Sequence, residues 1–154
     1  MREQKAPHPL VLDTSVAVKF YLPEELDDEA ARLLQAAESG AIEFSAPSTL
    51  QPEFFNALWQ RRRRGELSLE KVREGWADFV SDDPATIYAT EDLMPRAAEI
   101  VFESGVIVYD ALFLTLAEET GTVMVTADRK LLRDLKDTKF ARLALSLNNV
   151  ESII

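Results

Sequence analysis

The segment 106–132, VIVYDALFLTLAEETGTVMVTADRKLL, most constrains how this chain can fold. Its first half spaces apolar residues with the period of an amphipathic helix, and Gly121 is placed to end that helix. The apolar run 123–126 that follows has the length of a buried strand. A second helix is expected to open at Asp128, a residue type that favours helix starts. The segment therefore predicts a helix–strand–helix unit of an α/β fold.

This unit also places two aspartates at the ends of its elements. Asp110 lies in the first turn of the first helix, and Asp128 lies just beyond the carboxyl end of the strand. In an open parallel sheet, ligands bind in the loops beyond the carboxyl ends of the strands. Two carboxylates at one such edge repel each other unless a cation lies between them. A functional site at this edge would draw further polar groups from the ends of other strands.

The rest of the chain continues the alternation of short apolar strands and helices. Strands are expected at 10–12, 42–46, 86–89 and within 140–147. Helices are expected at 16–20, 23–38, 48–64, 68–80 and 93–104. Short strands that are apolar throughout and alternate with helices predict an α/β protein with a single parallel-stranded sheet sandwiched by helices.

At 154 residues the chain has the size of one domain. We expect a flexible N-terminal arm at 1–8, one folded domain at 9–147 and a C-terminal tail at 148–154. No apolar run approaches the ~20 residues that a membrane span needs. The N-terminus also lacks the apolar region of a secretion signal. These features predict a cytoplasmic protein that is not associated with a membrane.

The amino-acid composition removes several kinds of chemistry. The chain has no cysteine, which excludes disulfides, thiolate nucleophiles and cysteine–zinc sites. Its one histidine, His8, lies in the expected arm and is therefore a poor general base. The net charge of −10 disfavours broad electrostatic binding of nucleic acid. A nucleic-acid substrate would need a local basic patch or bridging metal ions.

Two further acidic residues are expected near the same edge of the sheet. Asp13 directly follows the strand 10–12, and taken alone it is equally well explained as a helix cap. Glu53 lies in the apolar half of the helix 48–64, and Asn56 shares its face three residues later. A lone glutamate at such a position is usually solvated or capping. If this helix packs on the sheet, however, it carries the carboxylate and the amide towards the strand ends.

Four consecutive arginines, Arg61 to Arg64, end that helix, where positive charge is favoured by the helix dipole. Successive residues fan around a helix, so at most two of the four share one direction. One interpretation is a solvated run that pairs with acids, and the other is a contact for phosphate or for an acidic partner segment. The sequence leaves both open.

Four motifs occur in the order and spacing characteristic of PIN-domain proteins: LVLDTSV, PEFFNALW, VYDALFLTLAEETG and VMVTADRKLL. Over about residues 9–147, the chain most resembles the VapC-like toxin ribonucleases of prokaryotic toxin–antitoxin pairs. The resemblance implies a PIN-like α/β/α nuclease domain with four catalytic, metal-binding acids: Asp13, Glu53, Asp110 and Asp128. It also implies three supporting polar groups: Thr14, Asn56 and Thr126.

The resemblance further implies Mg²⁺, or Mn²⁺, as cofactor, RNA as substrate, a cognate antitoxin protein as partner, and a homodimer. Carboxylates supply the hard oxygen ligands that Mg²⁺ prefers, and a bound cation reverses the local charge of an acidic cleft. Candidates to hold flanking RNA phosphates are four basic residues: Arg61, Arg62, Arg129 and Lys130. The predicted function is a metal-dependent endoribonuclease that hydrolyses RNA phosphodiester bonds as the toxin of a toxin–antitoxin pair.

Four alternatives compete with this prediction. A phosphatase of the haloacid dehalogenase type would need a second aspartate two residues after Asp13, where the chain has Ser15, and a phosphorelay receiver would need an acidic pair ending an early strand. A catalytically weak PIN-like fold could instead serve as an RNA-binding or protein-interaction module. Finally, the four acids could be unrelated caps and surface groups, in which case divalent cations would not stabilise the protein.

Overall fold

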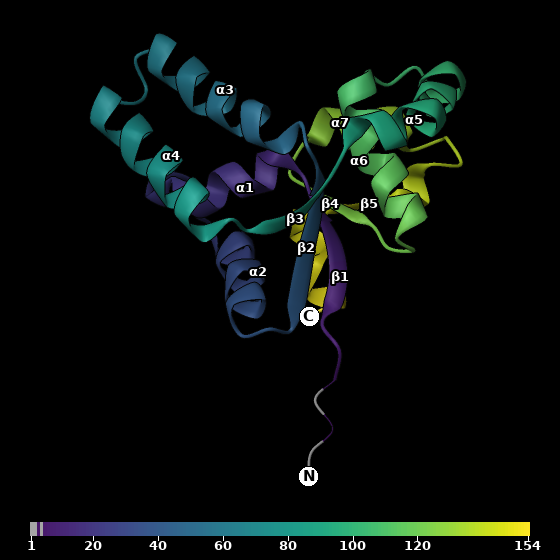
Figure 1. Ribbon diagram of the computed structural model, residues 1–154, viewed down its shortest axis with the longest axis horizontal. Coiled ribbons are helices and arrows are strands. Elements are labelled where there is room, and N and C mark those ends of the chain that lie inside the picture. The colour runs from purple at the N-terminus through teal and green to yellow at the C-terminus, as the bar shows by residue number, and fades with distance from the viewer. Residues whose placement is uncertain (1–2, 4) are drawn as a thin grey trace.

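Five parallel strands form one sheet in the order β3-β2-β1-β4-β5, with β1 at its centre (Figure 1). This computed structural model describes residue 3 and residues 5–154 of the chain. The strands are β1 (His8–Leu12), β2 (Ile42–Pro47), β3 (Ala85–Tyr88), β4 (Met124–Thr126) and β5 (Ala144–Ser146). Each pairing of neighbouring strands in this sheet is parallel, which confirms the predicted fold class.

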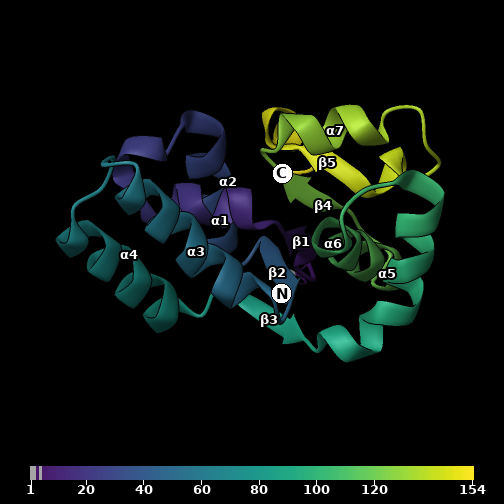
Figure 2. The same ribbon diagram turned by 90° about the horizontal axis from the view of Figure 1, so that it is seen from above.

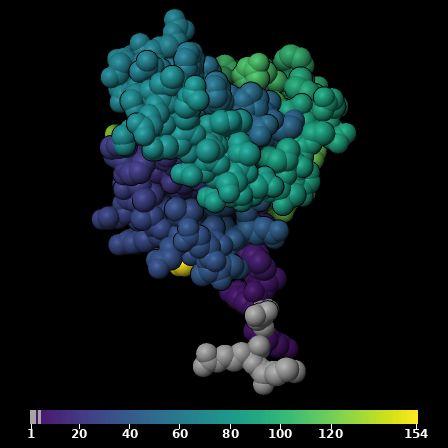
Figure 3. All heavy atoms as spheres, turned by 60° about the vertical axis from the view of Figure 1, so that its left-hand side comes forward, coloured from purple at the N-terminus to yellow at the C-terminus, as the bar shows by residue number. Residues whose placement is uncertain are grey.

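Helices cover both sides of the sheet. The α-helices are α1 (Thr14–Tyr21), α2 (Asp28–Glu38), α3 (Leu50–Arg63), α4 (Leu69–Asp82), α5 (Thr90–Ser104), α6 (Val108–Glu119) and α7 (Arg129–Leu135). Short 3₁₀-helices are η1 (Pro23–Glu25), η2 (Ala141–Leu143) and η3 (Leu147–Ser152). Figure 2 shows α1 to α4 on one side of the sheet and α5 to α7 on the other. In Figure 3 the teal surface of α3 and α4 covers the upper part of the face that is turned to the viewer.

The direction of the chain reverses at the central pair of strands. The chain leaves β1 towards β2 and leaves β4 towards β5, which lie on opposite sides of this pair. Right-handed crossovers then place the helices that follow β1 and β4 on opposite faces of the sheet. In α/β proteins, ligands bind beyond the carboxyl ends of the strands at such a topological switch point.

Helix α6 lies in the centre of the core. Its residues 111–117 are all buried, because it contacts β1, β2 and β4 and is covered by α5. A helix that is apolar on nearly all sides is stable only when it is surrounded in this way. Taken singly, no helix in the described part of the chain is long and apolar enough to cross a membrane. Only α5 and α6 taken together, across a bend of 115°, meet that criterion.

The start of β1 differs from the prediction. β1 begins at His8, two residues earlier than expected, because β2 pairs with it from His8 onward. On its other side, β4 pairs only with Val11 and Leu12. Pro9 lacks an N–H and argues against a central strand, but it lies before the pairing with β4 begins. The proline therefore removes no hydrogen bond from that side of the sheet.

Both ends of the described chain contribute to the fold. The arm expected at 1–8 includes residues 1, 2 and 4, which lie outside the described residues, and its last residue, His8, belongs to β1. The tail expected at 148–154 begins within η3, where Val150 is fully buried. The strand expected within 140–147 is β5.

The helix expected at 23–38 is divided in two. The 3₁₀-helix η1 ends at Glu25, and α2 starts only after Asp27, whose side chain accepts a hydrogen bond from the Ala30 N–H at 2.9 Å. An aspartate in this N-cap position favours a new helix start. The acidic segment 24–29 therefore contains the end of one helix and the start of the next, and not the first turn of a single helix.

Helix α3 starts at Leu50, two residues after the start of the helix expected at 48–64. Ser48 instead accepts a hydrogen bond from the Thr90 N–H at 3.3 Å, and Thr49 occupies the N-cap position without a capping hydrogen bond from its side chain. Ser48 thus links the segments that follow β2 and β3. Ser68, the first residue of the helix expected at 68–80, caps α4, because its hydroxyl accepts a hydrogen bond from the Lys71 N–H at 3.1 Å.

An aromatic cluster joins α1, α3 and α4. Phe54 is fully buried and stacks on Phe79 with ring centroids 4.0 Å apart. Tyr21 meets each of these rings edge-on at 5.6 Å. Aromatic pairs in these geometries add to the stabilisation that burial provides. The cluster fixes the first turn of α3 against α1, and this turn carries Glu53.

We expect Phe54→Ala to lower the free energy of unfolding by about 3–5 kcal/mol, because it removes a fully buried ring and leaves a cavity in the cluster. Urea denaturation followed by circular dichroism measures the change. Phe102→Ala is the matched control, since that ring is 77% exposed and its removal should change the unfolding free energy by less than about 0.5 kcal/mol. Equal losses in the two variants would contradict the role of the cluster.

Candidate active site

Four acidic residues lie at the amino ends of four helices, around the carboxyl ends of β1 and β4. Asp13 is the N-cap residue of α1, and Asp128 is the N-cap residue of α7. Glu53 lies in the first turn of α3, and Asp110 lies in the first turn of α6. The amino end of a helix is the positive end of its dipole, so these four positions favour carboxylates.

Asp13 and Asp110 each lie within electrostatic range of the other three carboxylates of the cluster. Burial is the main reason that the pKa values of Asp13, Glu53 and Asp110 are raised. In addition, the charge of Asp13 raises the pKa of Glu53 and of Asp110, and the charge of Asp128 raises that of Asp13. The fold therefore brings the acidic residues of the four sequence motifs to one edge of the sheet.

Two hydroxyl groups hold the Asp13 carboxylate. Asp13 is 7% exposed, and its Oδ2 accepts hydrogen bonds from Ser15 Oγ at 2.6 Å and from Thr126 Oγ1 at 2.7 Å. Ser15 Oγ accepts the Ala127 N–H at 3.0 Å, and Thr126 Oγ1 accepts the Asp128 N–H at 3.0 Å. This network ties the start of α1 to the loop between β4 and α7. The two hydroxyl hydrogen bonds lower the pKa of Asp13 and so oppose the increase that burial causes.

Asp128 is fixed by the helix that it caps. Its Oδ1 accepts a hydrogen bond from the Leu131 N–H at 3.1 Å. Leu131 is buried on the inner face of α7, so the capping hydrogen bond and the burial of Leu131 both hold the first turn of this helix. The aspartate predicted at the carboxyl end of the strand therefore has a structural role as a cap in addition to its place in the acidic cluster.

The pKa values of Glu53 and Asp110 lie well above the usual range of carboxyl groups. Burial raises the pKa of Glu53 to about 7 and that of Asp110 to about 6, and the neighbouring carboxylates add to both effects. The nearby hydroxyls of Thr49 and Thr14 act on Glu53 in the opposite direction. Both carboxyls are thus partly protonated near neutral pH when no cation is close.

Three buried oxygen atoms around Glu53 form no hydrogen bond of normal geometry with the described residues, although the two hydroxyls among them lie close enough to Glu53 to lower its pKa. They are Glu53 Oε2, Thr14 Oγ1 and Thr49 Oγ1. Buried polar atoms of native proteins are normally paired, so a group of unpaired oxygens marks a position for a water, an ion or a polar ligand. This is the strongest sign of a binding position at the acidic cluster.

The predicted supporting residues have different environments. Thr126 contacts Asp13 directly, and Thr14 contributes one of the unpaired oxygens. Asn56 lies one turn beyond Glu53 on α3, where it is exposed and hydrogen-bonds to none of the described residues through its side chain. Asn56 therefore lies on the same helix as Glu53, but no hydrogen bond to a described residue fixes the orientation of its side-chain amide.

The predicted phosphate contacts also differ. Arg61 donates two hydrogen bonds to Glu25, at 2.6 and 2.9 Å, which favours the acid-pairing interpretation for this arginine. Arg62 reaches the Leu67 carbonyl oxygen at 3.5 Å. Arg129 and Lys130 are exposed at the start of α7, and Lys130 interacts electrostatically with Asp110. The two residues on α7 are therefore the better placed near the acids.

Two hydroxyl residues of the site, Ser15 and Thr49, were not predicted from the sequence as site residues. Ser15 donates to Asp13, two residues before it, and reaches across to Ala127. The short spacing between Asp13 and Ser15 is a signal of such a local contact, because Ser side chains often bond to groups two residues away. No sequence signal distinguishes Thr49 from an ordinary N-cap.

The donor atoms of the site are oxygens of carboxyl and hydroxyl groups. Within residue 3 and residues 5–154, no group of three or more Asp, Glu or His side chains is arranged so that it could hold a metal ion. The donor set nevertheless fits Mg²⁺ or Mn²⁺, since it consists of carboxylate and hydroxyl oxygens and includes the unpaired Glu53 Oε2. Mg²⁺ commonly binds through one or two carboxylates and keeps several waters.

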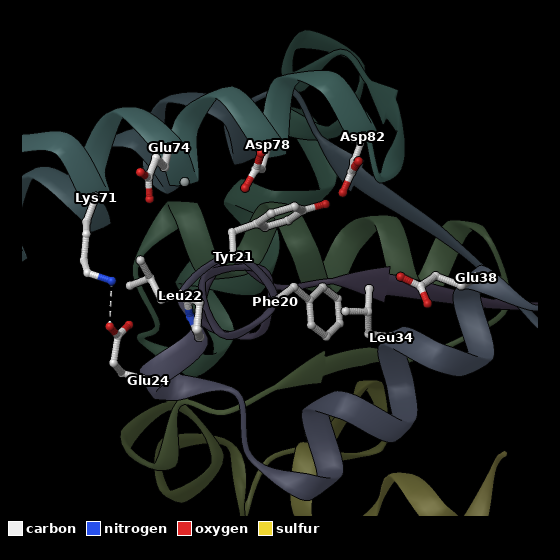
Figure 4. Close-up of a pocket in the computed structure, with 12 residues that line it drawn as sticks. Phe20, Tyr21, Leu22, Glu24, Leu34, Glu38, Lys71, Glu74, Asp78 and Asp82 are labelled. Carbon is white, nitrogen blue, oxygen red and sulfur yellow. Dashed lines mark hydrogen bonds and ion pairs between the residues drawn. The ribbon is translucent and has the colours of Figure 1, made fainter.

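A separate cavity of about 310 Å³ lies between α1, α2 and α4 (Figure 4). Figure 4 shows Tyr21 between the acids of α4, with its hydroxyl directed towards Asp82, and the ion pair between Lys71 and Glu24 at 2.9 Å. Burial, together with nearby Asp82, raises the pKa of Tyr21 above its usual range. None of the four acids of the candidate site lines this cavity, so it is distinct from that site.

Comparisons with known proteins agree with the fold and with the motifs. The family model for the PIN domain matches residues 10–140. Ribonuclease VapC3 of Pyrobaculum aerophilum is 32% identical over 127 residues, which cover 79% of this chain and 91% of that protein. The crystal structure of PAE2754 from Pyrobaculum aerophilum has a TM-score of 0.64 at 19% identity and covers 94% of this chain and 93% of its own. A toxin–antitoxin complex from Klebsiella pneumoniae has a TM-score of 0.58 at 12% identity, with coverages of 90% and 97%.

The raised pKa of Glu53 predicts how stability depends on pH without divalent ions. Between pH 4.5 and about 7 the folded protein binds more protons at Glu53 than the unfolded chain does, so this residue lowers the unfolding free energy as the pH rises. Glu53→Gln should make the decline smaller, since Asp13 and Asp110 still contribute to it, and the variant should be more stable than the wild type at pH 8 by about 1–3 kcal/mol. Urea denaturation in a chelating buffer at several pH values measures this difference. Glu43→Gln, which alters an exposed glutamate of β2, should leave the decline unchanged.

Proposed function

The chain belongs to the PIN domain family, and from this premise we propose that it is a metal-dependent endoribonuclease that hydrolyses RNA phosphodiester bonds. One observation carries the proposal. Four carboxylates from four chain segments gather at the switch point of the sheet, where Asp13 and Asp110 each lie within electrostatic range of the other three, and a buried oxygen of Glu53 is unpaired among them. Such a cluster is unfavourable by itself and becomes favourable when a cation neutralises it.

Asp13 and Asp110 are proposed as the main ligands of Mg²⁺ or Mn²⁺, either directly or through water. Glu53 and Asp128 complete the cluster or orient the attacking water. When bound, a divalent ion supplies an activated water and stabilises the negative charge that develops at the phosphorus. The absence of a preformed group of three ligands in the described residues is compatible with an ion that keeps most of its waters.

The residues of the site then have distinct tasks. The hydrogen bonds from Ser15 and Thr126 hold the Asp13 carboxylate in one orientation. Glu53 is suited to accept a proton from the attacking water, because its buried Oε2 has no hydrogen-bond partner among the described residues. Asp128 keeps one oxygen on the α7 backbone and can direct the other towards the water.

The acidic protein needs positive groups to hold a polyanionic substrate. Arg129 and Lys130 are proposed to contact phosphates that flank the scissile bond, since they begin the helix that follows Asp128. Of the two, Lys130 must first leave its ion pair with Asp134. Arg61 and Arg62 would serve this purpose only after they leave Glu25 and the Leu67 carbonyl oxygen. They are therefore secondary candidates for phosphate binding.

The biological setting is proposed from relatives. Ribonuclease VapC3 covers most of this chain, and a protein of the same fold occurs in a toxin–antitoxin complex. We propose that this protein is the toxin of such a pair, that a cognate antitoxin blocks its acidic site, that it forms a homodimer, and that it acts in the cytoplasm. The nuclease domain is proposed to extend over 9–147.

One second function has support from a specific observation. The acids lack a preformed group of three metal ligands in the described residues, which would suit a catalytically weak PIN-like module that binds RNA or a protein. Such a module would bind RNA without metal-dependent cleavage. The two experiments below separate it from the ribonuclease.

We expect Asp110→Asn and Asp13→Asn each to reduce Mg²⁺- or Mn²⁺-dependent cleavage of a long structured RNA by about 100-fold or more, because each removes a proposed ligand. Fragments are resolved by gel electrophoresis beside a chelator control. Asp137→Asn is the matched variant, since it removes an exposed carboxylate outside the cluster and should retain wild-type cleavage. Full activity of either cluster variant would overturn the assignment, and a wild type that binds RNA without cutting it would support the weak module.

Divalent ions should raise the melting temperature of the wild type by about 5–10 °C when present at roughly 100 times their dissociation constant. The increase follows because the ion binds only the folded state and relieves repulsion in the cluster. The double variant D13N/D110N should melt at or above the temperature of the metal-free wild type and should gain less than about 2 °C from the ions. Differential scanning calorimetry measures both values. A similar gain in the double variant would place the bound ion elsewhere.

A further inference from the structure

A strongly basic segment begins next to the acidic site. Residues 129–142 include six basic and two acidic residues, a formal charge of +4, whereas the rest of the chain includes 11 basic and 25 acidic residues, a charge of −14. All six basic side chains of the segment are exposed: Arg129, Lys130, Arg133, Lys136, Lys139 and Arg142. Positive charge in this protein is therefore concentrated at α7 and the turn that follows it.

Three of these residues form a basic stripe, defined here as Arg129, Arg133 and Lys136. They are spaced i, i+4 and i+7, and Lys136 at the C-cap keeps helical backbone angles, so all three share one face of the helix. Leu131 and Leu135 lie on the opposite face and are buried. The packing of α7 therefore holds the stripe towards solvent, over about 10 Å along the helix axis.

The charges of the basic stripe are not neutralised by the protein. The other basic side chains of the segment form ion pairs: Lys130 with Asp134 at 2.9 Å, Lys139 with Glu103 at 2.8 Å and Arg142 with Glu118 at 3.8 Å. By contrast, none of the ion pairs within residue 3 and residues 5–154 involves a residue of the stripe. Three uncompensated cations on one rigid helix form a surface that favours an anionic ligand.

The basic stripe starts at the acidic site. Arg129 directly follows Asp128, the N-cap of α7. Lys130, the next residue, interacts electrostatically with both Asp110 and Asp128. Figure 2 shows α7 on the side of the sheet that also carries α6, whose first turn holds Asp110. A polyanion that lies along the stripe therefore reaches the carboxylates at one of its ends.

We propose that the basic stripe is a track that holds the phosphates of single-stranded RNA on one side of the scissile bond, an inference that rests on the proposed ribonuclease function. Arginine binds phosphate through two parallel hydrogen bonds, and lysine binds it as a point charge. The stripe offers charged side chains only, whereas a protein partner would be expected to use aromatic or aliphatic anchors as well. Phosphate contacts carry no sequence information, so the track supplies affinity and direction, and cleavage preference arises elsewhere.

The test measures RNA binding separately from cleavage. The full chain with Asp110→Asn binds a fluorescent single-stranded RNA 20-mer, and the same protein with R129Q/R133Q/K136Q is compared with it between about 50 and 200 mM salt. We expect the triple change to weaken binding by about tenfold or more at the lowest salt. It should also reduce the slope of log affinity against log salt by about 2, since three phosphate contacts are lost at about 0.7 per contact.

The matched control is R32Q/K71Q/R73Q, which removes three exposed positive charges from α2 and α4 and should leave both quantities nearly unchanged. Equal effects of the two triple variants would overturn the track, because they would reflect net charge alone. RNA binding that is unchanged by R129Q/R133Q/K136Q, with loss of binding to poly-L-glutamate, would also overturn it and would assign the stripe to an acidic protein partner. Circular dichroism confirms that each variant is folded.

The outcomes for the track and for the nuclease are distinct. If the protein that keeps Asp110 fails to cleave RNA, but R129Q/R133Q/K136Q lowers the affinity for RNA, the ribonuclease proposal fails and the stripe remains an RNA-binding surface. If the protein that keeps Asp110 cleaves RNA, and R129Q/R133Q/K136Q binds and cleaves RNA as R32Q/K71Q/R73Q does, the ribonuclease proposal stands and the track proposal fails.

Discussion

Repulsion among partly buried carboxylates is the interaction that the rest of this structure must oppose. Burial raises the pKa of Glu53 to about 7 and that of Asp110 to about 6, and the charge of Asp13 adds to both effects. Two features hold the acids together despite this cost. Each acid lies at the amino end of a helix, where the dipole favours a negative charge. In addition, α6 is buried along residues 111–117, so moving its first turn away from the sheet would disrupt the core.

The hydroxyl network explains how parts of the site that are far apart in the sequence keep their geometry. Asp13 follows β1, and Thr126 ends β4, but these strands pair directly and leave both side chains at the same edge. Ser15 and Thr126 each use the hydroxyl hydrogen for Asp13 and accept a backbone N–H from the loop before α7. A change in the position of Asp13 is therefore transmitted to Asp128 through hydrogen bonds. The acids act as one unit, since neither loop can move without breaking this network.

The fold and the edge that carries the acids were predictable because both depend on local signals. Apolar runs of strand length alternate with helical periods, and Asp13, Asp110 and Asp128 lie at the junctions of these elements. Contacts between distant segments were not predictable. The pairing of Arg61 with Glu25 depends on how α3 packs against η1, and the extension of β1 back to His8 depends on β2. The unpaired oxygens of Thr14 and Thr49 depend on packing around Glu53, which no periodicity reports.

The distribution of charge gives the site a direction. A protein with a net charge of −10 repels RNA as a whole, so association depends on where its positive charges lie. The basic residues of α3 are partly engaged with acids and carbonyl groups, as Arg61 shows. Those of the α7 stripe are free of ion pairs among the described residues and begin beside Asp128. An RNA strand would therefore be attracted to the α7 side first and be repelled by the carboxylates until a divalent ion neutralised them. In this arrangement the affinity of the protein for RNA and the occupancy of its acidic site by a cation reinforce each other, because each lowers the electrostatic cost of the other.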